Sequence, residues 1–285
     1  MTLTVAIIAP GEMGSAVGRR LKERGARIVT TLAGRSAASI ARAERAGFSS
    51  IDDRARLVAE AQLILSIVPP GEAVALAESF VPALAAAREK PVYVDCNAVS
   101  PETARRIGAI LAPTDGPYVD AGIIGPPPSP SGRTVFYASG DAAAEFARLT
   151  PLGIEVRVLK APIGAASALK MSYAGLTKGI TALGSAMALG AARGGTTEAL
   201  IQELRESQPA LLTYLARLPT MFPKAYRWVA EMEEIAHFLT GDPAGQQIYH
   251  GAAQLYARLA EGAAEPDKGD LAAIAAFARL AKREN

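Results

Sequence analysis

The first residues in the chain that could bind a ligand are two glycines that follow a short apolar run. The run Thr4–Ile8 leads directly into Ala9-Pro10-Gly11-Glu12-Met13-Gly14, and a helical pattern follows. A glycine turn between a strand and a helix lets backbone N–H groups approach a pyrophosphate, which then lies at the positive end of the helix. Gly11 can provide that close approach, and Gly14 can let the helix pack against the strand. A dinucleotide fingerprint usually has a further glycine where this chain has Ala9, so an ordinary strand-to-helix turn is the alternative.

The end of the next apolar run bears on which dinucleotide would bind. That run, Arg27–Thr31, is followed by Leu32-Ala33-Gly34-Arg35-Ser36. A site for NAD usually has Asp or Glu here to accept hydrogen bonds from the ribose 2′-hydroxyl, and this segment has neither. Arg35 and Ser36 instead offer donors to a 2′-phosphate, which favours NADP over NAD. The alternative is that Arg35 is a solvated loop cation and that Ser36 caps the following helix.

The pattern around these residues predicts a sheet that would position them. Apolar runs alternate with helical segments up to about residue 160, as a parallel sheet covered by helices on both faces requires. The runs are Thr4–Ile8, Arg27–Thr31, Gln62–Val68, Pro91–Asp95, Tyr118–Ala121, Thr134–Ala138 and Glu155–Leu159. The helical segments include Glu12–Arg24, Ala37–Ala46, Glu72–Ala86 and Pro101–Leu111. We therefore predict an α/β fold for residues 1–162, a Rossmann-like, doubly wound and mostly parallel sheet that binds NADP.

Beyond residue 162 the strand pattern disappears. Residues Gly164–Ala192 form one long helical pattern that ends at Gly194-Gly195. Further helical segments follow, separated by prolines and by Gly241-Asp242-Pro243. We predict an all-α domain for residues 163–285, which begins with a long interdomain helix and serves substrate binding and dimerisation. Because Gly179–Ala192 has small residues on every face, we expect this helix to be buried in a homodimer.

The composition of the chain excludes several kinds of protein. The 285 residues contain 30 Lys and Arg against 28 Asp and Glu, a net charge of +2, so a nucleic-acid partner is not expected. Two His and one Cys make a zinc site hard to assemble, and we predict no metal site. The single cysteine, Cys96, fits a reducing compartment. With no bilayer-spanning run and no basic region before the first strand, we expect a cytoplasmic protein without a membrane partner.

Several motifs, in order, resemble the β-hydroxyacid dehydrogenases, the superfamily that includes 6-phosphogluconate dehydrogenase. Val5–Gly14 resembles the nucleotide loop of this family, and Ile67-Val68-Pro69-Pro70 resembles its Val-Pro loop after the fourth strand. Asp95–Pro101 and Tyr118–Pro126 resemble its Asp-x-Ser-Thr-x-x-Pro segment and its substrate segment. Gly164–Tyr173 resembles the helix with the catalytic lysine. The match covers about residues 4–193, and the remaining helices resemble a branch with a C-terminal domain of unknown function.

This resemblance implies an NAD(P)-dependent oxidoreductase that transfers a hydride between the nicotinamide and a hydroxy acid or related carbonyl compound. The segment after the second run makes NADP the expected cofactor. By the resemblance, Lys170 is the general acid/base and Asn97 lies beside the nicotinamide and the small-molecule substrate. For Asn97 the alternative is an amide that stabilises the turn before the helix at Pro101. The motifs and the end of the second run together give the expected cofactor-binding residues: Gly11, Glu12, Met13, Gly14, Arg35, Ser36, Val68, Pro69 and Asn97.

Lys170 has neighbours in the sequence that suit proton transfer. A hydroxyl whose carbon loses a hydride must also lose its proton, and a lysine can accept that proton only if its pKa falls toward neutrality. Burial and nearby positive charge both lower a lysine pKa, and the flanking residues are small and apolar. Lys178 falls on roughly the same helical face and could add charge or contact a substrate anion. The alternatives are a snorkelling side chain at Lys170 and a solvated one at Lys178.

Two positions depart from the family pattern and leave the substrate open. The substrate-binding serine of the family falls on Ile124, and the asparagine expected four residues after the lysine is Ala174. Tyr173, beside it, is either a pocket wall or a hydroxyl donor. The loop from Gly122 to Gly132 occupies the position of the family's substrate loop, with an ordinary connector as the alternative. The candidate substrate residues are Gly122, Ile124, Gly125, Tyr173 and Lys178.

Two other functions remain open from the sequence. An imine reductase has the same architecture, although those enzymes generally carry another residue where this chain has Lys170. A catalytically silent NADP-binding protein would explain the departures at Ala9, Ile124 and Ala174. Farther along the chain, a helical stripe of Arg227, Glu231 and Glu234 is expected to form ion pairs on a solvated face.

Overall fold

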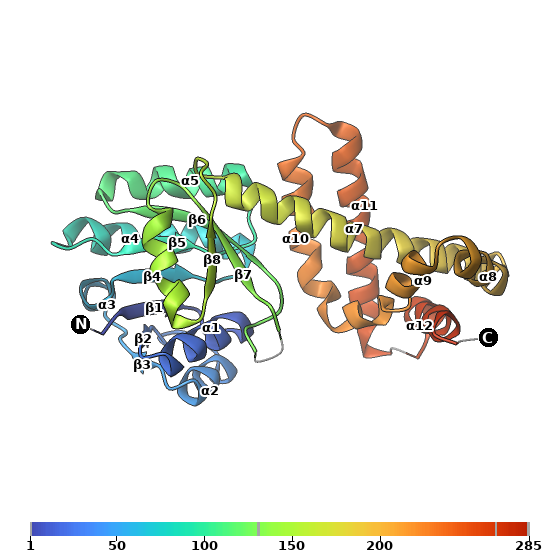
Figure 1. Cartoon of the computed structure of the whole chain (residues 1–285), viewed down its shortest axis with the longest axis horizontal. Helices are drawn as coiled ribbons and strands as arrows, with labels where there is room; N and C mark the ends of the chain where they lie inside the picture. Colours follow the sequence, from blue (N-terminus) through green and yellow to red (C-terminus); the bar gives the residue numbers. More distant parts are fainter. Residues whose placement is uncertain (1, 130–131, 266, 284–285) are drawn as a thin grey trace. The chain divides into compact units, whose positions relative to one another are not determined.

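The computed structural model describes residues 2–129, 132–265 and 267–283 and divides the chain into two compact units, Met1–Met171 and Ser172–Asn285 (Figure 1). The first unit is built around a sheet and the second is helical. The helix α7 (Ala165–Arg193) begins in the first unit and continues into the second. The division therefore falls inside this helix, whereas the sequence places a domain boundary just before it.

The sheet of the first unit has eight strands in the order β3-β2-β1-β4-β5-β6-β7-β8. Strands β6 and β7 pair antiparallel, and the other neighbours pair parallel. This arrangement confirms the predicted Rossmann-like, mostly parallel sheet. The strands are β1 (Thr4–Ile8), β2 (Arg27–Thr30), β3 (Ser49–Ser50), β4 (Leu63–Ser66), β5 (Val92–Asp95), β6 (Tyr118–Ile124), β7 (Val135–Ser139) and β8 (Glu155–Val158).

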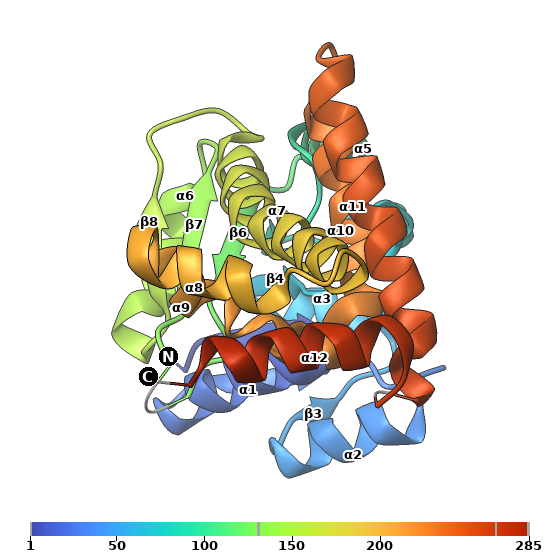
Figure 2. The same ribbon diagram turned by 90° about the vertical axis from the view of Figure 1, so that its right-hand side faces the viewer.

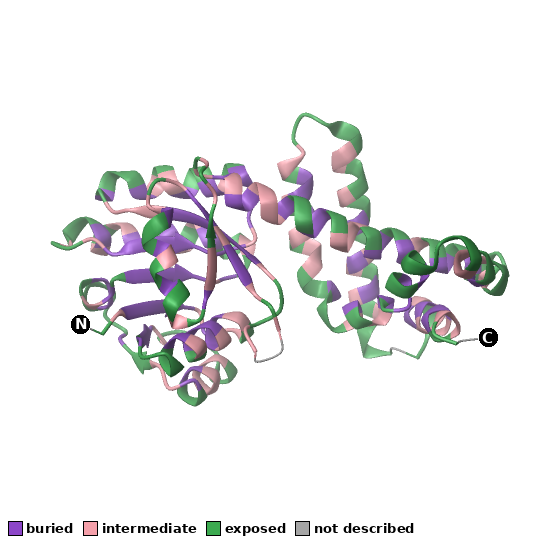
Figure 3. Ribbon diagram, in the orientation of Figure 1, coloured by how far each residue is buried: buried purple, intermediate pink, exposed green. Residues whose placement is uncertain are grey.

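Helices cover both faces of this sheet, as the apolar runs require. In β1, Val5 and Ile7 join one hydrophobic cluster, while Ala6 and Ile8 join the other. All four side chains are fully buried, because successive residues of a strand point to opposite faces and both faces are covered (Figure 3). The helices of this unit are α1 (Glu12–Glu23), α2 (Ala37–Arg45), α3 (Arg54–Glu60), α4 (Ala73–Ala86), α5 (Pro101–Leu111) and α6 (Ala143–Phe146).

Two elements between α2 and β4 are not indicated by the sequence pattern. Strand β3 consists of two exposed serines, so no apolar run marks it, and it pairs with the outer side of β2. Helix α3 has only seven residues, too few for a clear helical period. Its start is nevertheless capped, since the Asp53 carboxylate accepts a hydrogen bond from the Arg56 N–H at 2.9 Å.

The second unit confirms the predicted helical domain (Figure 2). Helices α10 and α11 pack against each other, with the rings of Trp228 and Tyr256 meeting edge to face at 5.2 Å between centroids. Its helices after α7 are α8 (Thr197–Ser207), α9 (Pro209–Leu215), α10 (Ala225–Phe238), α11 (Pro243–Glu261) and α12 (Gly269–Ala281), with a 3-10 segment at Leu218–Lys224. Within the described part of the chain, no helix is both long enough and apolar enough to cross a membrane.

Candidate cofactor and proton-transfer site

The turn between β1 and α1 has the backbone geometry of a phosphate-binding loop. Ala9 lies in the left-handed region with φ of 65°, and the Gly11 N–H donates a hydrogen bond to its carbonyl at 2.8 Å. A Cβ at Gly14 would lie 2.7 Å from the Ala9 carbonyl oxygen, so only glycine lets α1 begin this close to β1. Ala9 thus adopts the backbone conformation for which a fingerprint usually has glycine.

Gly11 differs from Gly14, because nothing in the described chain fills the space beside it. A Cβ built at Gly11 would meet no atom within 4 Å. The residue immediately precedes α1, where free backbone N–H groups and the helix dipole attract an anion. This combination leaves room for a phosphate at the carboxyl end of the central strand β1.

The loop after β2 is held by Asp52, a residue that the sequence analysis missed. The Asp52 Oδ1 atom accepts hydrogen bonds from the N–H groups of Leu32 at 3.0 Å and Ala33 at 3.2 Å. The bond from Leu32 contributes most to lowering the pKa of this carboxyl. An acid therefore lies next to the end of β2, but it binds the loop backbone. Because Asp52 lies 20 residues after Leu32 in the sequence, a local motif does not reveal this role.

Three polar side chains in α2 or just before it differ in how they are engaged. Ser36 caps α2, since its Oγ accepts a hydrogen bond from the Ser39 N–H at 3.3 Å, as the structural alternative requires. The Arg35 side chain has no hydrogen bond or ion pair to any residue that the structure describes. Arg42, which the sequence did not single out, donates from Nε to the Pro10 carbonyl at 3.1 Å and thereby ties α2 to the glycine loop. Arg35 and Arg42 therefore supply two guanidinium groups near the carboxyl ends of β2 and β1.

Asn97 is nearly fully buried and joins the ends of β4 and β5. Its Oδ1 accepts a hydrogen bond from the Val68 N–H at 2.7 Å, and its Nδ2 donates to the Ser66 hydroxyl at 2.8 Å and to the Asp95 carboxylate. Both amide hydrogens are thus used within the protein. This arrangement fixes the backbone of the Val68-Pro69 loop, which the family resemblance places at the cofactor.

Asp95 is a buried acid at the carboxyl end of β5. Burial raises the pKa of its carboxyl to about 7, with hydrogen bonds from Asn97 opposing the rise and the nearby Asp120 adding to it. The Tyr118 hydroxyl, 3.5 Å away, is directed mainly at the Ala104 carbonyl at 3.0 Å. The hydrogen bonds from Asn97 therefore favour the ionised carboxylate, whereas burial favours the neutral acid.

Asp120 anchors the first turn of α7 on strand β6. Its Oδ2 accepts hydrogen bonds from the N–H groups of Gly164 at 2.9 Å and Ser167 at 3.1 Å, and its Oδ1 accepts from the Ser167 hydroxyl at 2.6 Å. The Ser139 hydroxyl donates to the same carboxylate at 2.8 Å. A negative charge at a helix N-terminus satisfies the free N–H groups there. An isolated acid in an otherwise apolar strand was the only sequence signal for this anchor.

Lys170 lies one turn beyond this anchor, against the end of β6. Its Nζ donates a hydrogen bond to the Ile123 carbonyl at 2.8 Å. A Cβ at Gly122 would lie 2.9 Å from both the Ala166 carbonyl oxygen and the Lys170 Cβ, so the glycine is what lets α7 approach β6. The side chain is half-buried, so Lys170 is held in place and retains access to solvent.

The candidate substrate residues do not share one environment. Ile124 is the last residue of β6, and Gly125 has φ of 121°, where a Cβ would lie 2.2 Å from the Arg133 carbonyl oxygen. Gly125 is therefore required by the turn itself. The expected substrate loop continues through residues 130–131, which lie outside the described residues. In the second unit, Tyr173 is 47 % exposed.

Lys178 is not on a solvated face, which was one of the two roles considered for it. Its side chain is 14 % exposed and forms an ion pair with Glu231, which is 17 % exposed. Its Nζ also lies 5.2 Å from the centroid of the Trp228 ring. Burial lowers the pKa of Lys178, and the neighbouring Glu231 carboxylate raises it. The expected ion pairing of Glu231 is thus present, but it lies in the interior of the helical unit.

Among the residues that the structure describes, no three His, Cys, Asp or Glu side chains gather in a group that could hold a metal ion. The glycine turn, the crossing from β1 to β4 and the polar groups at the strand ends define a dinucleotide-binding domain of the Rossmann class.

Sequence comparison identifies the family within this class. Residues 4–152 match the NAD binding domain of 6-phosphogluconate dehydrogenase, and the chain belongs to this family. Residues 191–259 match a domain of unknown function, DUF1932. Both matches confirm the resemblance seen in the motifs, and they establish the first unit as an NAD(P)-binding domain.

The more similar relatives have no assigned activity. An uncharacterized 28.5 kDa protein of Methanothermus fervidus is 26 % identical over 239 residues, which are 83 % of this chain and 91 % of that protein. A solved conserved protein of unknown function, described as structurally similar to 3-hydroxyacid dehydrogenases, is 30 % identical with a TM-score of 0.70 and coverage of 91 % and 97 %. A conserved hypothetical protein from Sinorhizobium meliloti is 26 % identical with a TM-score of 0.73 and coverage of 98 % and 97 %.

More distant structures share the fold and have named activities. The 3-hydroxyisobutyrate dehydrogenase of Mycobacterium tuberculosis is 19 % identical with a TM-score of 0.64, and the match covers 97 % of this chain and 99 % of the dehydrogenase. A reductive aminase from Aspergillus terreus is 18 % identical with a TM-score of 0.56 and coverage of 93 % and 94 %. These likenesses show that the chain shares its fold with both proteins.

Proposed function

We propose that the protein is an NADP-dependent oxidoreductase that transfers a hydride between the nicotinamide and a hydroxy acid or related carbonyl compound, with Lys170 as the general acid/base. The observation that carries this proposal is the position of Lys170, whose Nζ is held 2.8 Å from the Ile123 carbonyl at the end of β6 in the NAD(P)-binding unit. Ligands of open α/β sheets bind beyond the carboxyl ends of the strands, which is where this amine lies.

The residues at the ends of β1 and β2 fit the phosphates of NADP. The space beside Gly11, at the N-terminus of α1, suits the pyrophosphate. Arg35 offers a guanidinium to the 2′-phosphate. Arg42, whose Nε donates to the Pro10 carbonyl of the glycine loop, adds a second cation. When bound, NADP would supply the hydride acceptor and NADPH the donor.

Lys170 would move the proton that accompanies hydride transfer. In oxidation, its neutral amine accepts the proton of the substrate hydroxyl as the carbon gives up its hydride. In reduction, its ammonium returns the proton to the carbonyl oxygen. The Ile123 carbonyl accepts one N–H of Lys170 and so keeps the amine in one place through both directions. Asn97 acts through Val68, whose N–H it binds, and thereby positions the Val68-Pro69 loop beside the cofactor.

The protein would act as a homodimer that pairs through α7. The apolar side chains of Leu176, Ile180, Leu183 and Met187 are 67 %, 41 %, 64 % and 55 % exposed, and they follow one another at spacings of four, three and four residues. This spacing puts them on one stripe of the helix, as in a helix-pairing seam. Monomeric proteins rarely leave such a row exposed. The seam consists of large side chains, whereas the sequence expectation relied on small ones.

A second candidate is the reduction of an imine, which the likeness in fold to the reductive aminase supports. Hydride transfer to a carbon–nitrogen double bond uses the same cofactor and also needs a proton donor. The two candidates differ in the substrate atom that Lys170 would face, an oxygen or a nitrogen.

A turnover screen separates these functions. Loss of NADPH fluorescence is followed with panels of keto acids, aldehydes and cyclic imines, and NADPH binding is measured in parallel. We expect turnover with keto acids or aldehydes. Turnover with imines alone would overturn the proposal in favour of an imine reductase, and tight NADPH binding without turnover across all panels would indicate a silent NADP-binding protein.

A further inference from the structure

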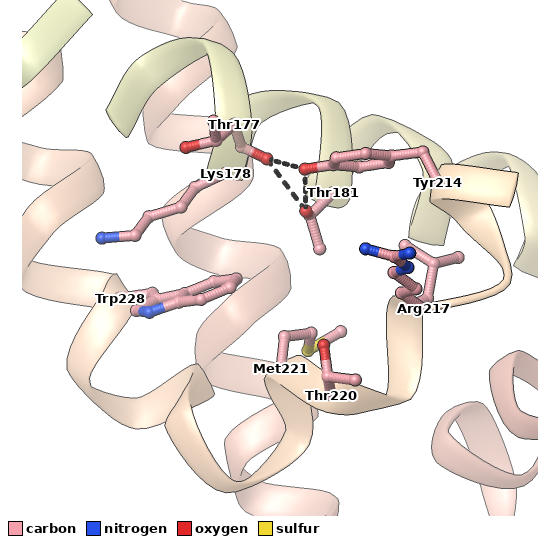
Figure 4. Close-up of a pocket in the computed structure, with 9 residues that line it drawn as sticks. Thr177, Lys178, Thr181, Tyr214, Arg217, Thr220, Met221 and Trp228 are labelled. Atoms are coloured by element: carbon pink, nitrogen blue, oxygen red, sulfur yellow. Dashed lines mark hydrogen bonds between the residues drawn. The ribbon is translucent and has the colours of Figure 1, made fainter. Parts of the chain in front are cut away.

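The helical unit contains a cavity of about 250 Å³ that the proposed hydride transfer does not use (Figure 4). It is bounded by α7, α9, the 3-10 segment Leu218–Lys224 and α10. Its volume is somewhat below the range of about 300–1,000 Å³ that holds drug-sized ligands, so it suits a smaller molecule. The cavity is lined by Thr177, Lys178, Thr181, Tyr214, Arg217, Leu218, Thr220, Met221 and Trp228.

One side of this cavity is a fixed polar rim. The Tyr214 hydroxyl donates to the Thr177 carbonyl, and the Thr181 hydroxyl donates to the same carbonyl at 2.9 Å. The hydroxyl oxygens of Tyr214 and Thr181 also lie 3.1 Å apart. Dashed lines in Figure 4 mark these contacts. Because these groups satisfy one another, the rim holds its shape without a ligand.

The charge at the cavity is positive overall. The Lys178 ammonium is neutralised by Glu231, while Arg217, which lines the cavity, forms no ion pair or hydrogen bond through its guanidinium in the described chain. Lys224 and Arg227 are close enough to Lys178 to disfavour its charged form. An anion entering here would meet the Arg217 guanidinium, which forms no ion pair in the described chain.

The opposite wall is apolar and contains the only tryptophan of the chain. Met221 and Leu218 are 0 % and 1 % exposed, and Trp228 is fixed edge to face against Tyr256. Figure 4 shows the Arg217 guanidinium directed into the space between Thr181 and Met221. Thr220 adds a hydroxyl that has no partner among the residues with described positions.

We propose that this cavity binds a small carboxylate with an aromatic or compact apolar body. Two of the five N–H groups of the Arg217 guanidinium hold the carboxylate in a bidentate pair, with the Thr220 hydroxyl as a further donor. The apolar body packs against Trp228 and Met221. Neither binding contact depends on NADP, so the proposal is separate from the hydride transfer proposed above.

Fluorescence of Trp228 provides a direct test with benzoate as the probe. Since Trp228 is the sole tryptophan, a change in tryptophan emission reports on this cavity. We expect a saturable change with benzoate, and at least tenfold weaker binding of benzamide, which has the same body without the charge. Arg217→Gln should weaken benzoate binding at least tenfold, whereas Arg279→Gln, an exposed arginine of α12 that does not line the cavity, should leave it unchanged.

Three results would overturn the carboxylate site. One is the absence of any saturable change with benzoate in the full-length protein without NADPH. The second is equal binding of benzoate and benzamide, and the third is equal effects of Arg217→Gln and Arg279→Gln. Both variants replace exposed side chains, and far-ultraviolet circular dichroism should match that of the parent protein.

Discussion

Among single residues, the side chains near the end of β2 illustrate which roles are visible in a sequence. Arg35 could be singled out because the segment after an apolar run lacked an acid. Asp52 and Arg42 could not, since only the fold brings residue 52 to the backbone of residues 32 and 33, and residue 42 to the Pro10 carbonyl. The arrangement of this loop and of α2 therefore depends on contacts that no local motif contains.

Substitution of Arg35 tests the preference for NADP. Arg35→Ala should weaken NADPH binding by roughly 10- to 100-fold, because it removes a charged donor to the 2′-phosphate, and should change NADH binding little. Dissociation constants for both nucleotides can be measured by fluorescence titration. Arg106→Ala, which removes another exposed arginine of the same unit, is the control. Equal weakening of NADPH and NADH would remove the basis for this preference.

The raised pKa of Asp95 predicts a pH dependence of stability. Its carboxyl has a pKa of about 7 in the folded protein and about 4 when exposed, so the folded state binds the proton more tightly. The resulting contribution to stability is complete below about pH 4 and is lost as the pH rises to about 7. Asp95→Asn keeps an oxygen acceptor for Asn97 and cannot ionise.

Urea unfolding at pH 5 and pH 8 measures this effect. Relative to the parent protein, Asp95→Asn should gain at least about 1 kcal/mol in free energy of unfolding between pH 5 and pH 8. The difference between the two proteins isolates Asp95, because other titrating groups are common to both. A pH dependence identical in parent and variant would show that Asp95 does not carry the buried proton.

Among the elements, those with apolar runs or long helical periods could be predicted, and the others could not. Seven strands were predicted at or within a few residues of their observed bounds, because each contributes buried side chains to the sheet. Strand β3 was missed because its two serines are exposed. The start of α7 was predicted from composition, but its anchoring on Asp120 required knowing that β6 lies beneath it.

The turn between β1 and α1 yields a prediction about stability. Ala9 has φ of 65°, a conformation that costs a residue with a Cβ about 1–2 kcal/mol. Ala9→Gly relieves this strain but gives the unfolded chain more freedom, so the net gain in free energy of unfolding should be about 0.5–1 kcal/mol. Thermal unfolding measures the change.

The matched control is Ala230→Gly, at an exposed position within α10. Glycine in a helix interior should lower the free energy of unfolding by about 1 kcal/mol. Destabilisation of similar size by both substitutions would contradict the left-handed conformation of Ala9.

For the whole molecule, the order of motifs along the chain identified the family, and the substrate stayed open. Gly122 and Lys170 lie in segments that match family motifs, and the structure shows why the glycine is needed beneath the lysine. Ile124 and Ala174 depart from the family pattern, but an absent polar group does not specify what replaces it. Composition alone likewise could not tell which apolar positions of α7 are exposed in the seam and which are buried.

Disruption of the α7 seam tests the homodimer. Leu183→Glu puts a charge in the middle of the seam and should weaken dimerisation at least tenfold, because that charge would have to be buried without a partner. Sedimentation velocity over a range of concentrations measures the association. Ile248→Glu changes an apolar side chain of α11 that is 66 % exposed and serves as the control. A parent protein that is monomeric at all concentrations would contradict the proposed pairing.

The central claim is that Lys170 carries the proton in an NADP-dependent hydride transfer, and steady-state turnover of Lys170→Ala with the best substrate of the NADPH screen tests it most directly. We predict that kcat falls by about 100- to 10,000-fold while the dissociation constant of NADPH stays within about twofold. Lys160→Ala, at an exposed lysine after β8, should leave both values unchanged. Turnover by Lys170→Ala equal to that of the parent protein would contradict the lysine mechanism.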